Sequence, residues 1–256
     1  MKRILLAVAY DGTAYCGWQV QKNGETIEGV LNRELSGLFG GDIQVIGASR
    51  TDSGVHALGN VAVFDTGTQM PGEKISYALN SRLPEDIRIQ KSLEVEGDFH
   101  PRKCACTKYY EYRILNREFE LPGRRLDTYF YRRPLDIERM RAAGSFLLGE
   151  HDFKSFCSIH TQAETTVRRI CALDVKREGD LIRIQVSGNG FLYNMVRIIA
   201  GTLIQVGSGI RNPEDMQSML ASCDRQSAGP TAPAKGLTLL GMEYEGGFFS
   251  SLPAAR

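Results

Sequence analysis

The 256-residue sequence predicts an α+β protein made of two similar units whose antiparallel sheets pack side by side. Two observations support this fold class. Short apolar or alternating runs, typical of strands, are interspersed with amphipathic segments of helical period, and they recur in a similar order in both halves. No low-complexity linker separates the halves. We therefore expect an N-terminal α+β unit at 1–100 and a C-terminal α+β unit at 101–256.

The first half follows a β-α-β-β-α-β order. "RILLAVAY" (3–10) is expected to be a buried strand, and the segment after it has apolar residues at helical spacing on one face: Ile27, Val30, Leu31, Leu35 and Leu38. The remaining elements are expected to be strands at 42–48 and 60–66, a short helix at 74–83 and a strand at 87–96.

The second half begins with the alternating strand "CACTKYYEYRIL" (104–115). Its period places Tyr110, Tyr112 and Ile114 on one face and Tyr109, Glu111 and Arg113 on the other. An amphipathic helix is expected at 135–149, with strands at 181–188 and 237–244. The segment 191–206 has eleven apolar residues in sixteen and no polar face, so it predicts a helix buried nearly all round.

Composition limits the class of protein. A hydrophobic content of 42% and a charged content of 24% are typical of a soluble globular chain. No run of 18 apolar residues and no cleavable leader pattern occurs, so we expect a cytoplasmic protein. The six cysteines include no Cys-x-x-Cys pair, which indicates neither a disulfide framework nor a zinc site.

Charge is unevenly distributed along the chain. The net charge of +1 argues against a general nucleic-acid binder, but residues 101–141 carry eleven Lys/Arg against six Asp/Glu, whereas residues 41–100 carry five against nine. The basic segment also contains seven tyrosines and phenylalanines between 109 and 131. Cations and aromatic rings together suit phosphates and unstacked bases. A solvated strand face with core aromatics explains the same residues, so both interpretations stay open.

Two charged residues stand out because each needs a partner. Arg197 lies within the apolar helical segment, where an ionised guanidinium is costly unless it is paired. Asp52 is the best candidate, because "GASRTDSGVH" (47–56) predicts a polar loop with a turn at Gly54. Asp52 alone is also typical of a turn or helix cap, and Arg197 alone of a side chain that extends to solvent at a helix edge.

Eight blocks of the sequence, spread over nearly the whole chain, carry a resemblance to a known family. The blocks are "YDGTAYCGWQVQ" (10–21), "SRTDSGVHALGNV" (49–61), "LPEDI" (83–87), "FHPR" (99–102), "KYYEYRIL" (108–115), "LLGEHDFKSF" (147–156), "FLYNMVRIIAGTLIQVG" (191–207) and "DRQSAGPTAPAKGL" (224–237). In these blocks, and in their order, the chain resembles the bacterial tRNA pseudouridine synthase A family. A lone Arg-Thr-Asp would be weak support, but eight ordered blocks are specific.

The resemblance implies a function and a set of site residues. It implies two ferredoxin-like units with a catalytic cleft between them, a homodimer, and isomerisation of uridine to pseudouridine in the anticodon stem-loop of tRNA, at positions 38 to 40. Asp52 matches the catalytic nucleophile, and Arg50 the residue that occupies the space of the flipped nucleotide. Arg197 matches the arginine that pairs with the aspartate, Tyr110 the tyrosine that stacks on the target base, and Leu237 the apolar residue that lines the pocket.

The absence of cofactor-binding motifs from the sequence agrees with the implied reaction. Pseudouridine formation breaks the N1–C1′ bond of uridine, turns the uracil and joins C5 to the same carbon, so no redox step or group transfer occurs. It requires neither a nucleotide cofactor nor a metal, in agreement with the absence of G-x-G-x-x-G and P-loop patterns. A carboxylate nucleophile attacks either C1′ of the sugar or C6 of the base, and the sequence leaves both routes open.

Three departures from the family pattern are mild: Ser49 stands where Gly is usual, Ser53 where Ala is common, and Asn60 where Gln is usual. Two other functions remain as alternatives. A non-catalytic RNA-binding module explains the basic aromatic segment but not a costly Asp–Arg pair. A hydrolase such as an N-glycosidase explains Asp52, but it usually needs a second carboxylate as the acid, and 49–61 contains none.

Overall fold

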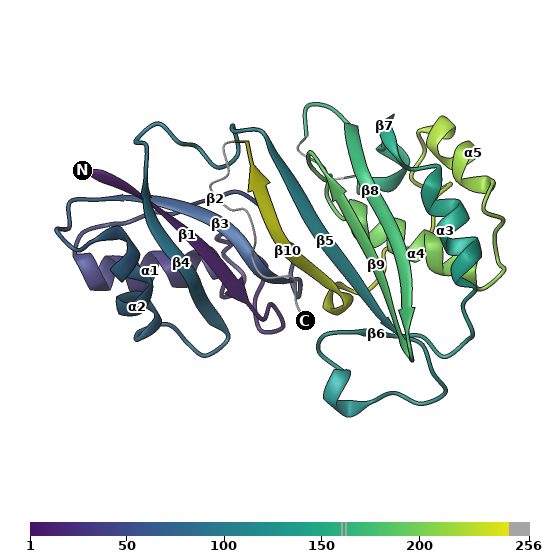
Figure 1. Cartoon of the computed structure of the whole chain (residues 1–256), viewed down its shortest axis with the longest axis horizontal. Coiled ribbons are helices and arrows are strands. Elements are labelled where there is room, and N and C mark those ends of the chain that lie inside the picture. Colours follow the sequence, from purple (N-terminus) through teal and green to yellow (C-terminus); the bar gives the residue numbers. More distant parts are fainter. Residues whose placement is uncertain (160, 162, 246–256) are drawn as a thin grey trace. The chain divides into compact units, whose positions relative to one another are not determined.

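The computed structural model describes residues 1–159, 161 and 163–245, and Figure 1 shows the path of the chain. The chain forms two compact units. Unit 1 contains Met1–Cys106 and resumes at Leu239, and unit 2 contains Thr107–Thr238. This division differs from the expected one, 1–100 and 101–256, because the last strand, β10 (Leu237–Tyr244), lies next to β3 and so contributes most of its length to unit 1.

Unit 1 contains a sheet in the order β4-β1-β3-β10, in which β1 pairs antiparallel with β4 and β3, and the short strand β2 also pairs antiparallel with β3. Its other strands are β1 (Lys2–Tyr10), β2 (Ile46–Gly47), β3 (His56–Thr66) and β4 (Ile87–Val95). Strands β1, β3 and β2, which are the first, third and second along the chain, therefore lie side by side in that order. The centre of β1 is buried throughout, as its apolar run predicts.

Two helices cover apolar surface in unit 1. Helix α1 (Ile27–Phe39) buries the predicted face through Ile27, Val30, Leu31 and Leu35, whereas Leu38 is only half-buried. It begins after Thr26, whose hydroxyl accepts a hydrogen bond from the backbone N–H of Gly29 at 3.2 Å. Helix α2 (Ile75–Asn80) follows a 3-10 turn (Gly72–Lys74) and packs against β4. The predicted β-α-β-β-α-β order of the first half is confirmed.

Unit 2 contains an antiparallel sheet in the order β5-β9-β8-β7. Its strands are β5 (Cys106–Leu115), β7 (Gly149–Asp152), β8 (Val167–Glu178), β9 (Leu181–Gly188) and the short β6 (Tyr129–Phe130), which pairs in parallel with β5. Among the three long strands of unit 2, β5, β9 and β8 are the first, third and second along the chain, and they lie side by side in that order, as β1, β3 and β2 do in unit 1. The predicted α+β class with two similar antiparallel units is therefore confirmed.

Three helices belong to unit 2: α3 (Ile137–Ser145), α4 (Met195–Gly207) and α5 (Asp215–Ser222). Helices α3 and α4 pack against each other, and α3 also contacts β8 (Figure 1). Every residue of α4 is buried except Arg197 and Gln205, so the prediction of a helix buried nearly all round is confirmed. The helix starts at Met195, because Asn194 has the left-handed φ of 62°. Arg197 consequently lies in the first turn of α4. The sequence had placed it in the middle of the apolar helical segment.

Several elements differ from the sequence expectation. The strand expected at 42–48 is reduced to two residues, and β7, β8 and α5 were not expected. Strand β8 buries only Ile170 and Val175 among its twelve residues, so its sequence shows no clear apolar alternation. The structure also has 3-10 turns at Pro122–Arg124, Lys154–Phe156 and Ala234–Gly236.

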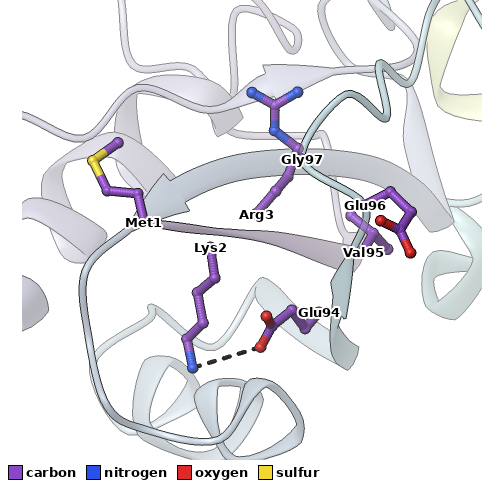
Figure 2. Close-up of a pocket in the computed structure, with 7 residues that line it drawn as sticks. All are labelled: Met1, Lys2, Arg3, Glu94, Val95, Glu96 and Gly97. Atoms are coloured by element: carbon purple, nitrogen blue, oxygen red, sulfur yellow. Dashed lines mark ion pairs between the residues drawn. The ribbon is translucent and has the colours of Figure 1, made fainter.

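A hollow lies where β1 begins and β4 ends, and Figure 2 shows its lining: Met1, Lys2, Arg3, Glu94, Val95, Glu96 and Gly97. None of these lining residues belongs to a motif that the sequence singles out. No helix among the described residues combines the length and the apolar character that crossing a membrane requires. Of the predicted site residues, Arg50 and Asp52 lie in the loop between β2 and β3. The others lie on β5 (Tyr110), α4 (Arg197) and β10 (Leu237).

Candidate functional site

The aspartate loop, defined here as residues 48–55, connects β2 to β3 in unit 1. It starts where the backbone N–H of Ala48 donates to the carbonyl oxygen of Val61 at 2.7 Å, and it turns where the N–H of Val55 donates to the carbonyl of Asp52 at 3.1 Å. Gly54 has a φ of 77°, a backbone conformation that favours glycine. The turn expected at Gly54 is therefore present.

Successive side chains of the aspartate loop have different environments. Arg50 is exposed, Thr51 is buried and Asp52 is half-buried. The Thr51 hydroxyl lies 2.7 Å from the Tyr10 hydroxyl, and the Thr51 carbonyl accepts from the backbone N–H of Trp18 at 3.0 Å. Thr51 thus fixes the backbone between the two charged residues, while Arg50 faces solvent.

The motif at 10–21, which precedes α1, packs against the aspartate loop. Gly17 has a φ of 87°, and a Cβ atom added to it would lie 2.6 Å from the carbonyl oxygen of Thr51, so only glycine fits at this approach. The carbonyl oxygen of Tyr15 accepts from the Ser53 hydroxyl at 3.1 Å and from the Gly54 N–H at 3.4 Å. The motif at 10–21 therefore supports both sides of Asp52.

A second carboxylate, Asp11, lies near the end of the aspartate loop. Its Oδ1 atom lies 3.1 Å from Nδ1 of His56 and accepts from the backbone N–H and the hydroxyl of Thr13 at 3.0 and 2.6 Å. Burial acts to raise the pKa of Asp11, but the Thr13 hydrogen bonds and the interaction with His56 outweigh it and hold the pKa below its usual range. Asp11 is ionised near neutral pH, so it does not supply the protonated acid that a glycosidase needs.

Tyr110 lies on β5 in unit 2, opposite Val186 of β9. It is 8% exposed, and its ring meets the edge of the Phe191 ring at a centroid distance of 5.2 Å and an interplanar angle of 81°. Tyr112 is also buried on the same strand face, as the alternation predicts, and burial raises the pKa of its hydroxyl while the positive charge of Arg197 opposes that effect. The Tyr110 ring is held in a defined orientation by aromatic packing.

Arg197 makes hydrogen bonds within unit 2. Its Nε donates to the carbonyl oxygen of Ala232 at 2.8 Å, and one terminal nitrogen donates to Oδ1 of Asn194 at 2.7 Å. The backbone N–H of Ala232 in turn donates to the carbonyl of Arg197 at 3.1 Å. The guanidinium is half-buried and has neutral acceptors close by, which the sequence did not indicate. A cation in a first helical turn opposes the helix dipole, so a nearby anion is favoured there.

The loop at 229–236 leads into Leu237, the first residue of β10. The backbone N–H of Gly229 donates to the hydroxyl of Thr202 at 2.9 Å, and Arg197 binds the middle of the loop through Ala232. Tyr112 completes the attachment by donating its hydroxyl to the carbonyl of Pro233 at 2.8 Å. Leu237 is buried at the end of this loop.

The basic segment divides between core and surface. Tyr110 and Tyr112 belong to the core, whereas Phe119 is 68% exposed. The arginines at 124, 125, 132 and 133 are all exposed. Arg124 forms an ion pair with Asp127 at 2.9 Å, and Arg125 donates to the carbonyl of Pro122 at 3.1 Å. The segment after β5 therefore presents cations and an exposed aromatic ring on the surface of unit 2.

Comparison with known families identifies the class of protein. The family model described as tRNA pseudouridine synthase matches residues 6–102 and 143–245. The chain belongs to the tRNA pseudouridine synthase family. Arg50, Asp52, Arg197 and Leu237 fall within the matched ranges, whereas Tyr110 lies between them.

Individual relatives agree along nearly the whole chain. The chain is 46% identical over 244 residues to a tRNA pseudouridine synthase A of Acetivibrio thermocellus and to one of Brevibacillus brevis, covering 95% of this chain and all of each relative. It is 47% identical over 245 residues to one of Ruminiclostridium cellulolyticum, with the same coverage. These relatives include the segment that contains Tyr110.

Membership of the synthase family confirms the predicted reaction class, an isomerase that forms pseudouridine in tRNA. It decides against the non-catalytic module and the hydrolase. Of the predicted site residues, Arg50 and Asp52 belong to unit 1, and Tyr110, Arg197 and Leu237 belong to unit 2. The roles of these five residues remain predictions. The sequence did not point to the hydrogen-bonding partners that hold the two loops.

Proposed function

We propose that this synthase isomerises uridines in the anticodon stem-loop of tRNA, at positions 38 to 40, with Asp52 as the nucleophile. The observation that carries the proposal is the environment of Asp52. It is a half-buried carboxylate on a turn whose neighbouring residue is buried and hydrogen-bonded, inside a segment that matches the synthase family. A carboxylate on a well-supported turn suits nucleophilic attack, because the reacting oxygen needs a defined position.

The chemistry requires attack, rotation and rejoining. The Asp52 carboxylate adds either to C1′, displacing N1, or to C6 of the base, after which the N1–C1′ bond breaks. After the uracil turns, a C5–C1′ bond forms and the bond to Asp52 breaks. C5 then loses its proton and N1 ends protonated. The product is an isomer of the substrate, with the same atoms. Both routes need an ionised Asp52, for which Arg197 is the proposed counter-charge.

The other predicted residues take supporting roles in this proposal. The base must leave its stack before the carboxylate reaches it, at a cost of a few kcal/mol, and the exposed Arg50 fills the space that it leaves. Tyr110 stacks on the extruded uracil and places its hydroxyl near C5, where a proton departs. Leu237 contacts the uracil from its other side. The ring packing of Tyr110 on Phe191 supports its role as a fixed platform.

One experiment tests the reaction and its position. A tRNA transcript labelled with tritium at C5 of uridine is incubated with the enzyme, and a matched transcript has cytidine at positions 38 to 40. We expect tritium release and pseudouridine formation with the first transcript only, and no free uracil. Release of free uracil contradicts the isomerase mechanism. Equal tritium release from both transcripts contradicts the assignment to the anticodon stem-loop.

We further propose that the enzyme acts as a homodimer in the cytoplasm, where its tRNA substrate is processed. The dimer is implied by the resemblance, and the second subunit helps to hold the L-shaped tRNA. Light scattering across a dilution series gives the mass, and turnover per chain is measured at the same concentrations. We expect a dimer whose dissociation lowers turnover. A fully active monomer contradicts the proposal.

A further inference from the structure

Four buried polar residues form a connected network beneath the aspartate loop. They are Tyr10 at the end of β1, Asn60 in β3, and Ser49 and Thr51 in the loop. None is more than 7% exposed, and Asn60 is completely buried. Polar side chains in such positions are normally hydrogen-bonded, because an unpaired polar group is costly away from water.

Asn60 binds the loop backbone on both of its polar sides. Its Oδ1 accepts from the N–H of Ser49 at 3.3 Å, and its Nδ2 donates to the carbonyl of Ser49 at 2.9 Å. The side-chain amide therefore satisfies the N–H and the C=O of one loop residue, as a neighbouring strand would. Its Nδ2 also donates to the Tyr10 hydroxyl at 3.3 Å.

Tyr10 extends the network to the residue before Asp52. Its hydroxyl lies 2.7 Å from the hydroxyl of Thr51, and its ring packs against Trp18 at a centroid distance of 6.0 Å. The backbone N–H of Trp18 donates to the carbonyl of Thr51. The side chain and the carbonyl of Thr51 are therefore both held by the Tyr10–Trp18 pair.

Filling the core does not require these hydroxyl groups. Phenylalanine at 10 and valine at 51 would occupy nearly the same volumes, and apolar side chains suit a buried site better than hydroxyls do. What the hydroxyls add is direction, because a hydrogen bond between two packed side chains allows a narrow range of orientations. That direction is imposed on the backbone from which Asp52 projects.

We propose that Tyr10, Thr51 and Asn60 are positioning residues that set the orientation of the Asp52 carboxylate. The inference rests on the proposed function, in which Asp52 is the nucleophile. The network acts on the chemical step and not on tRNA affinity, because its members are buried and Asn60 and Tyr10 bind residues of the aspartate loop. A shift of about 1 Å in a reacting group lowers a rate by about 100-fold.

The test compares Thr51→Val, Thr51→Ser and Tyr10→Phe in the full-length enzyme, with single-turnover rate, tRNA Kd and thermal midpoint measured for each. We expect Thr51→Val and Tyr10→Phe to slow the chemical step by on the order of 10- to 100-fold with Kd within about threefold of wild type. Thr51→Ser keeps the hydroxyl and should restore most of the rate. The double variant that combines Thr51→Val with Tyr10→Phe should be no slower than the slower of these two single variants, because each change removes the same hydrogen bond between Tyr10 and Thr51.

Tyr244→Phe is the matched control, since Tyr244 is another buried tyrosine of unit 1 whose hydroxyl donates to the carbonyl of Pro101 at 2.9 Å. It should lower the thermal midpoint as Tyr10→Phe does and leave the rate unchanged. Equal rate losses in the two variants, or wild-type rates in Thr51→Val and Tyr10→Phe, overturn the positioning role. Full activity of Asp52→Asn overturns the proposed function instead, so the two failures are distinguishable.

Discussion

The aspartate loop and the 229–236 loop, which leads into the predicted site residue Leu237, are held in different ways. The aspartate loop of unit 1 is attached by neutral groups around Asp52, through the side chains of Asn60 and Tyr10 and the backbone of the motif before α1. The 229–236 loop of unit 2 is attached by Arg197, which is itself a predicted site residue. Hydrogen-bonding support and the proposed chemistry therefore rest on different residues in the aspartate loop, whereas Arg197 of α4 combines the attachment of the 229–236 loop with a proposed catalytic role.

This difference determines what a substitution reports. In the aspartate loop, a change at residue 52 alters the proposed nucleophile, whereas the hydrogen bonds of Thr51 to Tyr10 and of Ser49 to Asn60 are made by other residues. In unit 2, a change at residue 197 removes a charge and also releases the carbonyl of Ala232. Loss of activity at Arg197 therefore has two interpretations, which only a stability measurement separates.

The largest effect is expected for Asp52→Asn. Pseudouridine formation should fall by about 10⁴-fold or more, because the amide is a poor nucleophile. The tRNA Kd should stay within about threefold of wild type, since most affinity comes from phosphate contacts. Single-turnover tritium release and filter binding give the two values. A near-wild-type rate contradicts the assignment of Asp52, and Asp65→Asn on the surface is the matched control.

Arg197→Met should produce the next largest effect, and it should affect both properties. Activity is expected to fall by orders of magnitude. The free energy of unfolding should fall by about 3 kcal/mol, because the guanidinium hydrogen bonds to Ala232 and Asn194 are lost. Urea unfolding and tritium release measure the two changes. Near-neutral behaviour in both contradicts its attachment role and its catalytic role together.

Two further variants separate the roles of Arg197. Thr202→Val loosens the same loop by removing the bond to Gly229, and it should cost about 1 kcal/mol with little loss of rate. A double-mutant cycle between Arg197→Met and Asp52→Asn should give a coupling energy of about 0.5 to 3 kcal/mol if the charges pair. Additive losses of stability would show that Asp52 has its counter-charge elsewhere.

The sequence predicted the repeated units well, because their strands and helices bury regular apolar faces. Strands β1 and β9 and helix α1 have clear periods, and each has bounds within a residue or two of those expected. Strand β8 was not predicted because half of its twelve residues are charged and only Ile170 and Val175 are buried. The start of α4 was misplaced because nothing in the composition of 191–194 reveals that Asn194 adopts a left-handed backbone.

The candidate site could be predicted only in part. Motif resemblance indicated Asp52 and Arg197, since their residue types suit the reaction. The supporting contacts depend on residues far apart in the chain: Asn60 binds Ser49, and Arg197 binds Ala232, 35 positions away. Such pairs leave no periodic pattern. Nothing in the residue type of Asn60 indicates that its side chain binds the backbone of Ser49.

A smaller effect is expected on the exposed arginines after β5, and it separates affinity from chemistry. If Arg125 contacts a tRNA phosphate, Arg125→Gln should reduce the slope of log K against log salt by about 0.7 to 0.9. Arg124→Gln should reduce it less, because Arg124 is already paired with Asp127. Filter binding from low to high salt gives the slopes. Arg33→Gln on α1 is the control, and equal slopes in all variants contradict a role for this surface.

The smallest effect concerns an ion pair outside both loops, and it tests whether only the loops control the rate. Arg3 donates two hydrogen bonds to Asp65, at 2.8 and 2.7 Å, and these bonds hold the pKa of Asp65 below its ordinary value of 3.8. A carboxyl group whose pKa is lower in the folded state stabilises the fold above its unfolded pKa, and that stabilisation is lost as pH falls through the folded pKa. Asp65→Asn should therefore lower the free energy of unfolding by less than about 1 kcal/mol at pH 7, since the pair is partly exposed, and the difference should shrink below about pH 4. Urea unfolding at pH 7 and pH 3.5 measures this difference in the free energy of unfolding.

Glu94→Gln, which removes the 3.8 Å pair with Lys2 drawn in Figure 2, should change stability even less, because no hydrogen bond joins that pair. Neither variant should alter tritium release, and a rate loss in either one would break the distinction between the loops and the surface.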